Sequence, residues 1–427
     1  MYQAHTLENG LRVYLIPVPV FQSVSIGVFV RVGSRYERQA EAGVSHFIEH
    51  MLFKGTTRRP SARIIAETIE GVGGLSNAYT SQEATVYYAK VASAQASTAL
   101  DVLADLVRHP LFDPAEFEKE RYVIGEELNM IYDSPDSWAN VLLDQVLWPN
   151  HPLGHNIVGT AESLTTLSRD ALTAYFEAGY HPQNALVAIG GAFDSDKILA
   201  EVTALLGDWQ PGDVPSFEPV APPQTRARWH VEDRPIEQGH LCLALPGLSR
   251  RDPDRYALSV LNTVLGEGMS SRLFLNIREE KGLAYAVDSS LNLLQDTGSL
   301  AIYAGVDPDR APEALQAILD ELDRLRTEPV PPAELHKVKE YLKGRLVLGL
   351  EDSFSRAAWV AYQALFLEDI KSPEEVLQAY NAVTAEDVLA VAQKILSPNA
   401  YNLAVVGPFG KGEALGRLLG NAEFVSL

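Results

Sequence analysis

The chain has 427 residues and a net charge of −21 at pH 7, with 46% hydrophobic and 21% charged residues. Its length is roughly two to three times that of an ordinary domain, and its composition is that of a globular protein, so we expect two large domains. The acidic charge argues against nucleic acid as the main partner, because phosphate binding requires clustered Lys and Arg.

Cysteine usage and the first residues indicate the compartment. Cys242 is the only cysteine, which excludes an internal disulfide and a cysteine-based metal cluster. It lies in an apolar run at residues 241–245 that is typical of a buried strand. Residues 1–5 lack the features of a signal peptide, and no stretch of about 18 uncharged apolar residues occurs. We therefore expect a cytoplasmic protein without a membrane partner.

Strand signals begin near the N-terminus. The turn dipeptide Asn9-Gly10 precedes the first of several short runs rich in β-branched and apolar residues. These runs predict strands at residues 11–16, 24–32, 85–91 and 185–189.

Helix signals alternate with these strands. Ser61 and Gly71 are the expected cap and stop of a helix over residues 62–70. A further helix begins at Pro114, where Asp113 can cap the first turn and Glu116 completes a pattern like a capping box. Together with the strands, these helices predict an α+β fold.

Prolines mark a linker near the middle of the chain. Residues 210–224 hold five of them, which cannot donate backbone hydrogen bonds to a helix or a central strand: Pro211, Pro215, Pro219, Pro222 and Pro223. We place a first domain at residues 1–212, a linker at residues 213–225 and a second domain at residues 226–427.

The two halves repeat one order of features at nearly constant spacing. Each has a helix that opens at a proline, at Pro114 and Pro332. Later in each half comes a helix cap, which is Ser168 in the first and Thr384 in the second. A proline before an apolar strand follows (Pro182 and Pro398), and then a phenylalanine (Phe193 and Phe409). A repeated order indicates that the domains are diverged copies.

The sequence His46-Phe47-Ile48-Glu49-His50 carries the clearest chemical signal. On a helix, His46 and His50 lie about 40° apart and Glu49 lies about 60° to the other side of His46, so the three side chains share one face. Two imidazoles one turn apart can hold a zinc ion, and a carboxylate beside them can accept a proton from the attacking water. His-x-x-Glu-His is a signature of zinc peptidases. The alternative is a pair of helix histidines that only pack or cap.

A third ligand is expected from the helix after Pro114. Its core-facing stripe contains Phe117, Glu120, Val123, Ile124 and Glu127. Carboxylates on an apolar face require a cation or a metal ion as partner. Glu127 is the favoured ligand, since Glu126 points about 100° away, and Glu120, two turns earlier, is favoured to orient a ligand histidine. The alternative is that both pair with Arg or Lys.

The second half lacks this chemistry. Counted from Pro332, Glu127 corresponds to Arg345 and Glu120 to Val338, and residues 252–268, which roughly match the metal-binding helix, contain no histidine. We therefore expect one metal ion per chain, held by the first half.

Three motifs resemble peptidase family M16, which includes pitrilysin, insulin-degrading enzyme and the β subunit of the mitochondrial processing peptidase. They are residues 43–56 (GVSHFIEHMLFKGT), residues 77–80 (NAYT) and residues 120–127 (ERYVIGEE). The resemblance covers nearly the whole chain and is closest in length to the short two-domain members. It implies two homologous domains, each a mainly antiparallel sheet packed with helices.

The resemblance also implies roles for residues. His46, His50 and Glu127 match the zinc ligands and Glu49 the general base, with Glu120 as a supporting carboxylate of the site. In the second half, Arg278 and Tyr285 match an Arg/Tyr pair that contacts substrate near the scissile bond, and would make them part of the catalytic set. Without the resemblance, Arg278 reads more simply as a salt bridge at a helix end.

Substrate binding follows from the same resemblance. A peptide is expected to add as a strand beside residues 75–80, with contacts to Asn77, Ala78 and Tyr79, through backbone hydrogen bonds that select sequence weakly. The implied activity is that of a zinc metalloendopeptidase acting on unfolded peptides held in a chamber.

Assembly and an alternative function remain open at this level. Because the zinc motif and the Arg/Tyr pair occur in one chain, a homodimer is favoured, while a heteromeric partner of the same family is the alternative. The M16 fold also serves in non-catalytic subunits of a respiratory complex. The chain could therefore be a scaffold or assembly subunit, although such subunits typically lose the metal residues that this chain retains.

Overall fold

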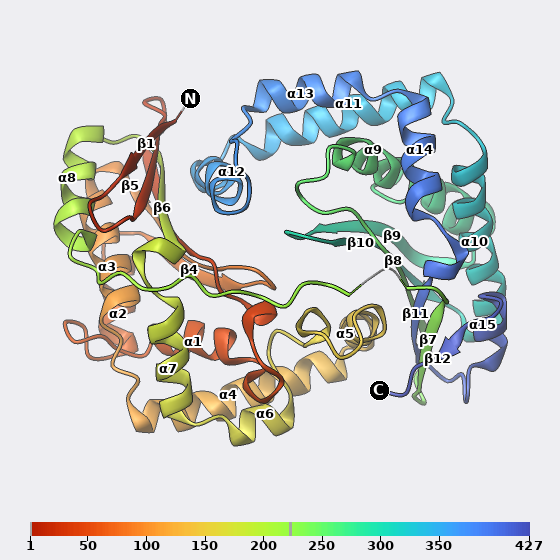
Figure 1. Ribbon diagram of the computed structural model, residues 1–427, viewed down its shortest axis with the longest axis horizontal. Helices are drawn as coiled ribbons and strands as arrows, with labels where there is room; N and C mark the ends of the chain where they lie inside the picture. Colours follow the sequence, from red (N-terminus) through yellow and green to blue (C-terminus); the bar gives the residue numbers. More distant parts are fainter. Residues whose placement is uncertain (1, 222–223) are drawn as a thin grey trace. The chain divides into compact units, whose positions relative to one another are not determined.

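The computed structural model describes residues 2–221 and 224–427 (Figure 1). Pro222 and Pro223 of the predicted linker lie outside these residues. The chain divides into two compact units. Unit 1 comprises Met1–Asn129, His155–Glu218 and Leu348–Lys371, and unit 2 comprises Met130–Gly154, Pro219–Val347 and Ser372–Leu427.

These units differ from the continuous halves expected on either side of the linker. Residues 130–154 belong to unit 2 although they precede the linker, and residues 348–371 belong to unit 1 although they follow it. The predicted linker itself is divided between Glu218 and Pro219. The difference arises because an amphipathic pattern shows that a helix has a buried face but not which sheet covers that face.

Unit 1 contains a sheet with the strand order β1-β2-β6-β3-β5-β4. Its strands are β1 (Gln3–Thr6), β2 (Arg12–Pro17), β3 (Ser23–Val30), β4 (Leu75–Thr80), β5 (Thr85–Ala92) and β6 (Ala185–Gly191). Neighbours pair antiparallel except β2 and β6, which are parallel. The four strands predicted from the sequence are present with shifts of only one or two residues at most ends.

The helices of unit 1 include both of those expected from the sequence. They are α1 (Val44–Leu52), α2 (Ala62–Glu70), α3 (Ala96–Arg108), α4 (Pro114–Asp133), α6 (Ala161–Thr166), α7 (Arg169–Gly179), α8 (Ser195–Leu206) and α12 (Ser353–Phe366). Short helical turns are η1 (Ser34–Tyr36), η2 (Gln39–Glu41), η3 (Ser93–Gln95) and η5 (Pro182–Asn184). Ser61 caps α2 and Asp113 accepts two backbone N–H groups at the start of α4, which explains why both helices begin where predicted.

Unit 2 repeats this topology with the order β12-β7-β11-β8-β10-β9. Its strands are β7 (Arg228–Asp233), β8 (Gly239–Pro246), β9 (Ala284–Leu293), β10 (Gly298–Val306), β11 (Asn402–Gly407) and β12 (Glu423–Phe424). β7 and β11 are parallel, as are β2 and β6, and the order from that pair to the far edge is the same in both sheets. The units are thus two copies of one α+β fold, as the repeated sequence features predicted. They differ at the near edge, which is the N-terminal β1 in one and the C-terminal β12 in the other.

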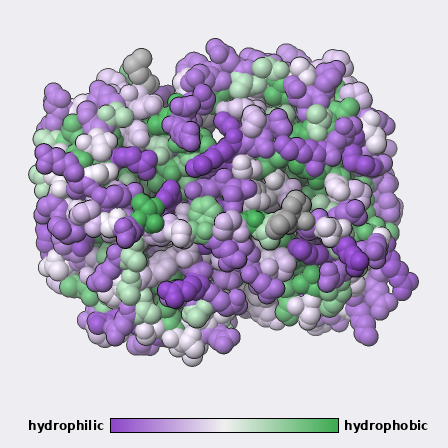
Figure 2. Space-filling model, viewed as in Figure 1, coloured by the Kyte–Doolittle hydropathy of each residue, from purple (hydrophilic) through white to green (hydrophobic). Residues whose placement is uncertain are grey.

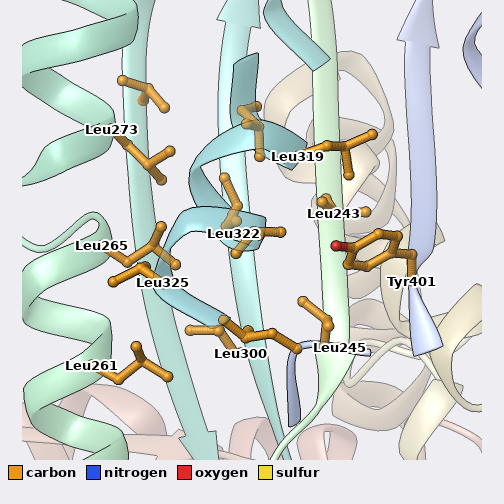
Figure 3. Close-up of a cluster of buried hydrophobic side chains, with 14 of the residues drawn as sticks. Leu243, Leu245, Leu261, Leu265, Leu273, Leu300, Leu319, Leu322, Leu325 and Tyr401 are labelled. Atoms are coloured by element: carbon orange, nitrogen blue, oxygen red, sulfur yellow. The ribbon is translucent and has the colours of Figure 1, made fainter. Parts of the chain in front are cut away.

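The helices of unit 2 follow the same order. They are α5 (Pro135–Leu147), α9 (Arg255–Leu265), α10 (Ala311–Thr327), α11 (Pro332–Gly349), α13 (Pro373–Ala382), α14 (Ala385–Ile395) and α15 (Glu413–Leu418), with the short turns η4 (Pro152–Gly154), η7 (Pro308–Arg310) and η8 (Pro398–Ala400) and the π-helix η6 (Phe274–Glu280). α9 and α10 cover one face of the sheet with leucines (Figure 3). The interdigitated side chains include Leu243, Leu245, Leu261, Leu300 and Leu322.

In unit 1, α12 covers one face of the sheet, although this helix comes from the C-terminal half of the chain (Figure 1). Its alanines pack against Phe29, Leu186 and Ala188. A Cβ atom on Gly190 would lie 2.4 Å from the Ser353 carbonyl oxygen, so only glycine allows this approach. Lys90 also forms an ion pair with Asp352 just before the helix.

α5 occupies the corresponding place on the unit 2 sheet. Its apolar side chains pack against Cys242, Ala244, Ala404 and Val406. Cys242 is fully buried on β8, as its apolar run predicted. Each compact unit is therefore completed by a helix from the opposite half of the sequence.

Polar residues are more common than apolar ones on the face of the molecule that Figure 2 shows. The face in Figure 2 is mainly hydrophilic with scattered apolar residues, consistent with the strongly acidic composition. None of the helices within residues 2–221 and 224–427 combines the length and apolar character that a membrane crossing requires.

Candidate metal centre

Helix α1 carries the His46–His50 motif, and its apolar side is tightly packed in the core. Gly43 precedes it with φ of 91°, and a Cβ atom there would lie 2.6 Å from the Val158 carbonyl oxygen, so glycine is required at this turn. Phe47, Ile48, Met51 and Leu52 are fully buried. The remaining face of the helix carries the two histidines and Glu49, as the helical spacing predicted.

Helix α4 is held in register with α1 by stacked aromatic rings. The Phe47 and Phe117 rings have centroids 4.6 Å apart and an interplanar angle of 6°. The Arg121 guanidinium lies 4.8 Å from the centroid of the Phe117 ring. This contact sets α4 so that Glu120 and Glu127 face the histidines of α1.

Three side chains converge at one point. Glu127 Oε2 lies 3.7 Å from His46 Nε2 and 3.6 Å from His50 Nε2. One ligand atom from each of the three residues fits within 4.8 Å of the others, and this is the only such group of His, Cys, Asp or Glu found in the described parts of the chain. The adjacent Glu126 is exposed and takes no part.

The distances from Glu127 to the two histidines suit ligands of a shared zinc ion better than they suit direct hydrogen bonds. At 3.6 and 3.7 Å the nitrogen and oxygen atoms are too far apart for good hydrogen bonds. Ligands about 2.0–2.2 Å from a tetrahedral zinc ion stand about 3.3–3.5 Å from one another, so small shifts would bring all three side chains within reach of one ion. Burial and the nearby His50 lower the pKa of His46 to about 4, which keeps its ring neutral and able to ligate.

Glu120 fixes the orientation of His50. Its Oε2 atom lies 3.0 Å from His50 Nδ1 and its Oε1 atom 2.7 Å from Lys54 Nζ. Burial would raise the pKa of Glu120, but the hydrogen bonds from His50 and Lys54 bring it below its ordinary value. An ionised Glu120 accepts the Nδ1 proton of His50, which leaves the Nε2 lone pair directed at the metal position.

Glu49 is aligned by a strand residue. The Thr80 hydroxyl at the end of β4 donates to Glu49 Oε2 at 2.6 Å, and the two carboxylate oxygens are thereby made inequivalent. Burial raises the pKa of Glu49, and the Thr80 bond partly opposes this shift. A carboxyl group with a raised pKa beside a metal position is suited to exchanging protons.

Lys54 and Thr80 were not assigned roles from the sequence. Both stand inside the motifs at residues 43–56 and 77–80, so their motif membership was the available signal. Their contacts depend on how α1 approaches α4 and β4, which spacing along the chain does not determine.

The residues predicted to bind substrate lie on β4, an edge strand of the unit 1 sheet. Among the strands that the structure describes, β4 is bonded to β5 alone, so no neighbouring strand lies along its other edge. Ala78 is buried, and Tyr79 accepts a hydrogen bond from the Tyr362 hydroxyl at 3.0 Å. Asn77 accepts the Ala78 N–H, which shapes the strand locally.

Arg278 and Tyr285 belong to unit 2. Arg278 lies on η6, stacks 4.8 Å from the Phe274 ring centroid and 5.4 Å from that of Tyr285, and has a weak ion pair with Glu279. Tyr285 is the second residue of β9 and is 78% exposed. The two side chains therefore neighbour one another and are accessible to solvent.

One expectation about the α4 stripe is wrong. Val123 is 45% exposed, whereas Phe117, Glu120 and Ile124 are buried. The helix turns its Val123 side away from α1, because the stacked Phe47 and Phe117 rings fix its rotation.

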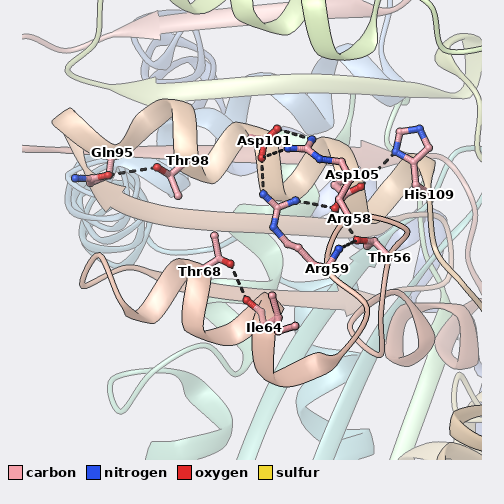
Figure 4. Close-up of polar contacts among 10 residues, drawn as sticks. All are labelled: Thr56, Arg58, Arg59, Ile64, Thr68, Gln95, Thr98, Asp101, Asp105 and His109. Atoms are coloured by element: carbon pink, nitrogen blue, oxygen red, sulfur yellow. Dashed lines mark hydrogen bonds and ion pairs between the residues drawn. The ribbon is translucent and has the colours of Figure 1, made fainter.

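A buried ionic network holds the loop that follows α1 (Figure 4). Asp105 on α3 accepts hydrogen bonds from Thr56 Oγ1 and Arg59 Nη1, both at 2.6 Å. Arg59 also pairs with Asp101 one turn earlier. The network anchors residues 56–59 to α3 and so limits movement at the C-terminal end of α1.

Comparison with known proteins places both halves of the chain in one peptidase family. The family model described as Insulinase (Peptidase family M16) matches residues 12–161, which include the three converging residues His46, His50 and Glu127. The model described as Peptidase M16 inactive domain matches residues 166–342. This second match falls mainly on the half without the histidine motif.

Relatives and solved structures extend the match to nearly the full chain. An uncharacterized zinc protease of Bacillus subtilis is 38% identical over 411 residues, covering 96% of this chain and 99% of the relative. One from Mycobacterium tuberculosis is 39% identical over 417 residues, covering 96% and 94%.

Structures show the same fold. A Helicobacter pylori protease has a TM-score of 0.90 at 25% identity, covering 96% of this chain and 99% of that one. A chain in the structure of complex III2 from Candida albicans has a TM-score of 0.83 at 19% identity, covering 98% and 99%. With its two matching domains and its full-length relatives, the chain belongs to peptidase family M16.

Proposed function

We propose that the protein is a zinc-dependent endopeptidase that hydrolyses peptide bonds of unfolded peptides. The observation that carries this proposal is the convergence of His46, His50 and Glu127 with Glu49 on the same helix face. Three protein ligands leave one position of a tetrahedral ion open, which is the arrangement of catalytic rather than structural zinc. We infer one zinc ion per chain, because no such group occurs among the described residues of the second unit.

Zinc, when bound, would supply a Lewis acid that polarises the peptide carbonyl and acidifies water. Glu49 takes a proton from the attacking water at the carboxylate oxygen that does not accept from Thr80. It then delivers that proton to the nitrogen of the leaving amine. Glu120 holds His50 in the tautomer that ligates through Nε2 throughout this cycle.

The substrate is proposed to bind as an added strand along residues 75–80 of β4, on the edge that no described strand of the sheet covers. Arg278 and Tyr285 are proposed to contact the substrate backbone near the scissile bond, and their exposure is compatible with this role. Binding through backbone groups selects extended, unfolded peptides with little sequence preference.

A homodimer in the cytoplasm is the proposed working form, in which four homologous domains enclose a chamber. A heteromeric partner of the same family is the alternative assembly. The likeness to a chain of a respiratory complex is a likeness of fold at 19% identity, and the intact ligand set favours a peptidase over a scaffold.

The test replaces Glu49 by glutamine. We expect Glu49→Gln to retain about one zinc ion per chain while cleavage of an unstructured peptide falls at least about a thousandfold, because the proton acceptor is lost. Glu126→Gln, an equal change at an exposed position beside a ligand, is the control and should cleave normally. A scaffold protein would bind no zinc or show no chelator-sensitive cleavage in the wild type. Full turnover by purified Glu49→Gln would refute the assignment of the base.

A further inference from the structure

Glu37 is a buried carboxylate to which the proposed reaction gives no role. It is only 2% exposed and lies between η1 and η2, ahead of the metal-binding helix. Its Oε2 atom accepts the Gly43 N–H at 2.7 Å, and its Oε1 atom accepts the Ser45 N–H at 2.8 Å. Both oxygens are thus directed at the start of α1.

Helix α1 needs this partner because it has no cap of its own. The N-cap residue is Gly43, which has no side chain to accept the free N–H groups of the first turn. Glu37 supplies the missing acceptor from six residues earlier. Its negative charge also lies at the positive end of the helix dipole.

The bonded amides adjoin a metal ligand. Ser45 is the residue immediately before His46, and its hydroxyl is 3.1 Å from the Tyr175 hydroxyl, so both its backbone and side chain are held. A rotation of the first turn about the helix axis would move His46 directly. It would also move Glu49, one turn later on the same face.

The segment that carries Glu37 is itself tied to the hairpin formed by β4 and β5. Arg35 forms a buried ion pair with Glu83 at 2.7 Å, and its backbone N–H donates to the Gln82 carbonyl at 2.9 Å. This hairpin carries Thr80, whose hydroxyl donates to Glu49. Residues 35–37 therefore connect the helix that bears the ligands with the strand that aligns the base.

We propose that Glu37 is a positioning residue, which fixes the first turn of α1 and thereby sets the geometry of His46 and Glu49. The inference rests on the proposed metal centre but extends it to a residue that touches neither metal nor substrate. A carboxylate is required because both oxygens accept N–H groups. Glutamine offers one acceptor and sets its own N–H group against the second amide.

The unfavourable free energy of burying the Glu37 carboxylate supports a specific role for this residue. Burial raises the pKa of Glu37 to about 7, against the lowering effect of the hydrogen bonds from Ser45 and Gly43. A glutamate is rarely retained in such a place without a structural or functional need.

The experiment compares Glu37→Gln and Glu37→Asp with the control Glu41→Gln. Glu41 is a nearby, half-buried glutamate whose carboxylate pairs with Arg38 at 3.4 Å and is not the acceptor for the Gly43 and Ser45 amides. Affinity for Co²⁺ and Zn²⁺ is measured by competition with a chromophoric chelator, and the visible spectrum of the Co²⁺ form reports ligand geometry. Hydrogen exchange of α1 amides is followed in the metal-free proteins.

We expect Glu37→Gln to bind metal about 10- to 100-fold more weakly, the range typical of residues that orient ligands. Its Co²⁺ spectrum should change, its kcat should fall more than its KM rises, and its α1 amides should exchange faster. Glu37→Asp should recover part of each property, since it keeps the charge but reaches less far. Glu41→Gln should match the wild type.

The proposal would be overturned if a folded Glu37→Gln protein had the same metal affinity, Co²⁺ spectrum and α1 amide exchange as the wild type. If that variant does not fold, wild-type values in folded Glu37→Asp would overturn it, because the shorter side chain cannot reach both amides. A wild-type protein that binds metal without cleaving peptides would refute the proposed function alone. If the wild type binds no metal, the exchange measurement still decides whether Glu37 holds the helix.

Discussion

Replacing Glu120 by glutamine separates the charge of this residue from its shape. Glu120 is buried, and its two oxygens contact His50 Nδ1 at 3.0 Å and Lys54 Nζ at 2.7 Å. Glutamine can still accept from His50 through its carbonyl oxygen, so the ring orientation survives. The bond changes from one with a charged acceptor, worth about 1.5–3 kcal/mol, to a neutral one of about 0.5–1.5 kcal/mol.

The expected loss for Glu120→Gln is therefore about 1–2 kcal/mol in zinc binding, or roughly 5- to 30-fold in affinity. Glu120→Leu removes the acceptor altogether and should reach about 100-fold, because the His50 tautomer is then no longer fixed. Lys54 is partly exposed and can turn to solvent in both variants, which limits the damage to the fold.

Zinc affinity is measured by chelator competition on metal-free protein, with urea unfolding as a check on stability. Glu118→Gln is the matched control: it lies on the same helix, faces solvent and pairs with Arg121 at 3.0 Å. It should bind zinc normally. Affinities within twofold of the wild type for both Glu120 variants would show that this residue does not orient the ligand, and the reasoning would fail.

Two further predictions concern buried groups that stabilise the fold, one in each unit. Asp105→Asn should lower the free energy of unfolding by about 2–4 kcal/mol in urea titrations, because it leaves the buried Arg59 with Asp101 as its remaining carboxylate partner; the more exposed Asp101→Asn should cost less, and the reverse order would contradict the network. Burial, with the nearby Asp288 and Asp144, raises the pKa of the Cys242 thiol, so native protein should resist iodoacetamide at pH 8 and react only on unfolding, as followed by mass spectrometry. Rapid labelling of native protein would show that α5 does not seal this face of β8.

The sequence predicted those features that are encoded locally. Helix α2 begins after Ser61 and ends before Gly71 because a hydroxyl cap and a stop residue suffice to define it. The face shared by His46, Glu49 and His50 follows from helical periodicity alone. The choice of Glu127 over Glu126 also needed only the direction of each side chain on one helix.

Contacts between different helices and strands could not be predicted from the sequence in this way. Lys54, Thr80 and Glu37 act through neighbours that lie far along the chain or on another element, and no periodic pattern specifies those approaches. The compact units were likewise not the predicted halves, because the apolar faces of α5 and α12 do not reveal which sheet they cover. Sequence repetition identified the two copies but not the helices they exchange.

The exchange of α12 has a consequence for synthesis of the protein on the ribosome. The last strand of the unit 1 sheet ends at Gly191, whereas the helix that covers one of its faces begins at Ser353. At 5–20 residues per second, roughly 160 residues take about 8–32 seconds to translate. During that interval Phe29, Leu186 and Ala188 lack their cover, so the nascent N-terminal half presents an apolar sheet face on which chaperones can act. Unit 1 is completed only after most of unit 2 has been made.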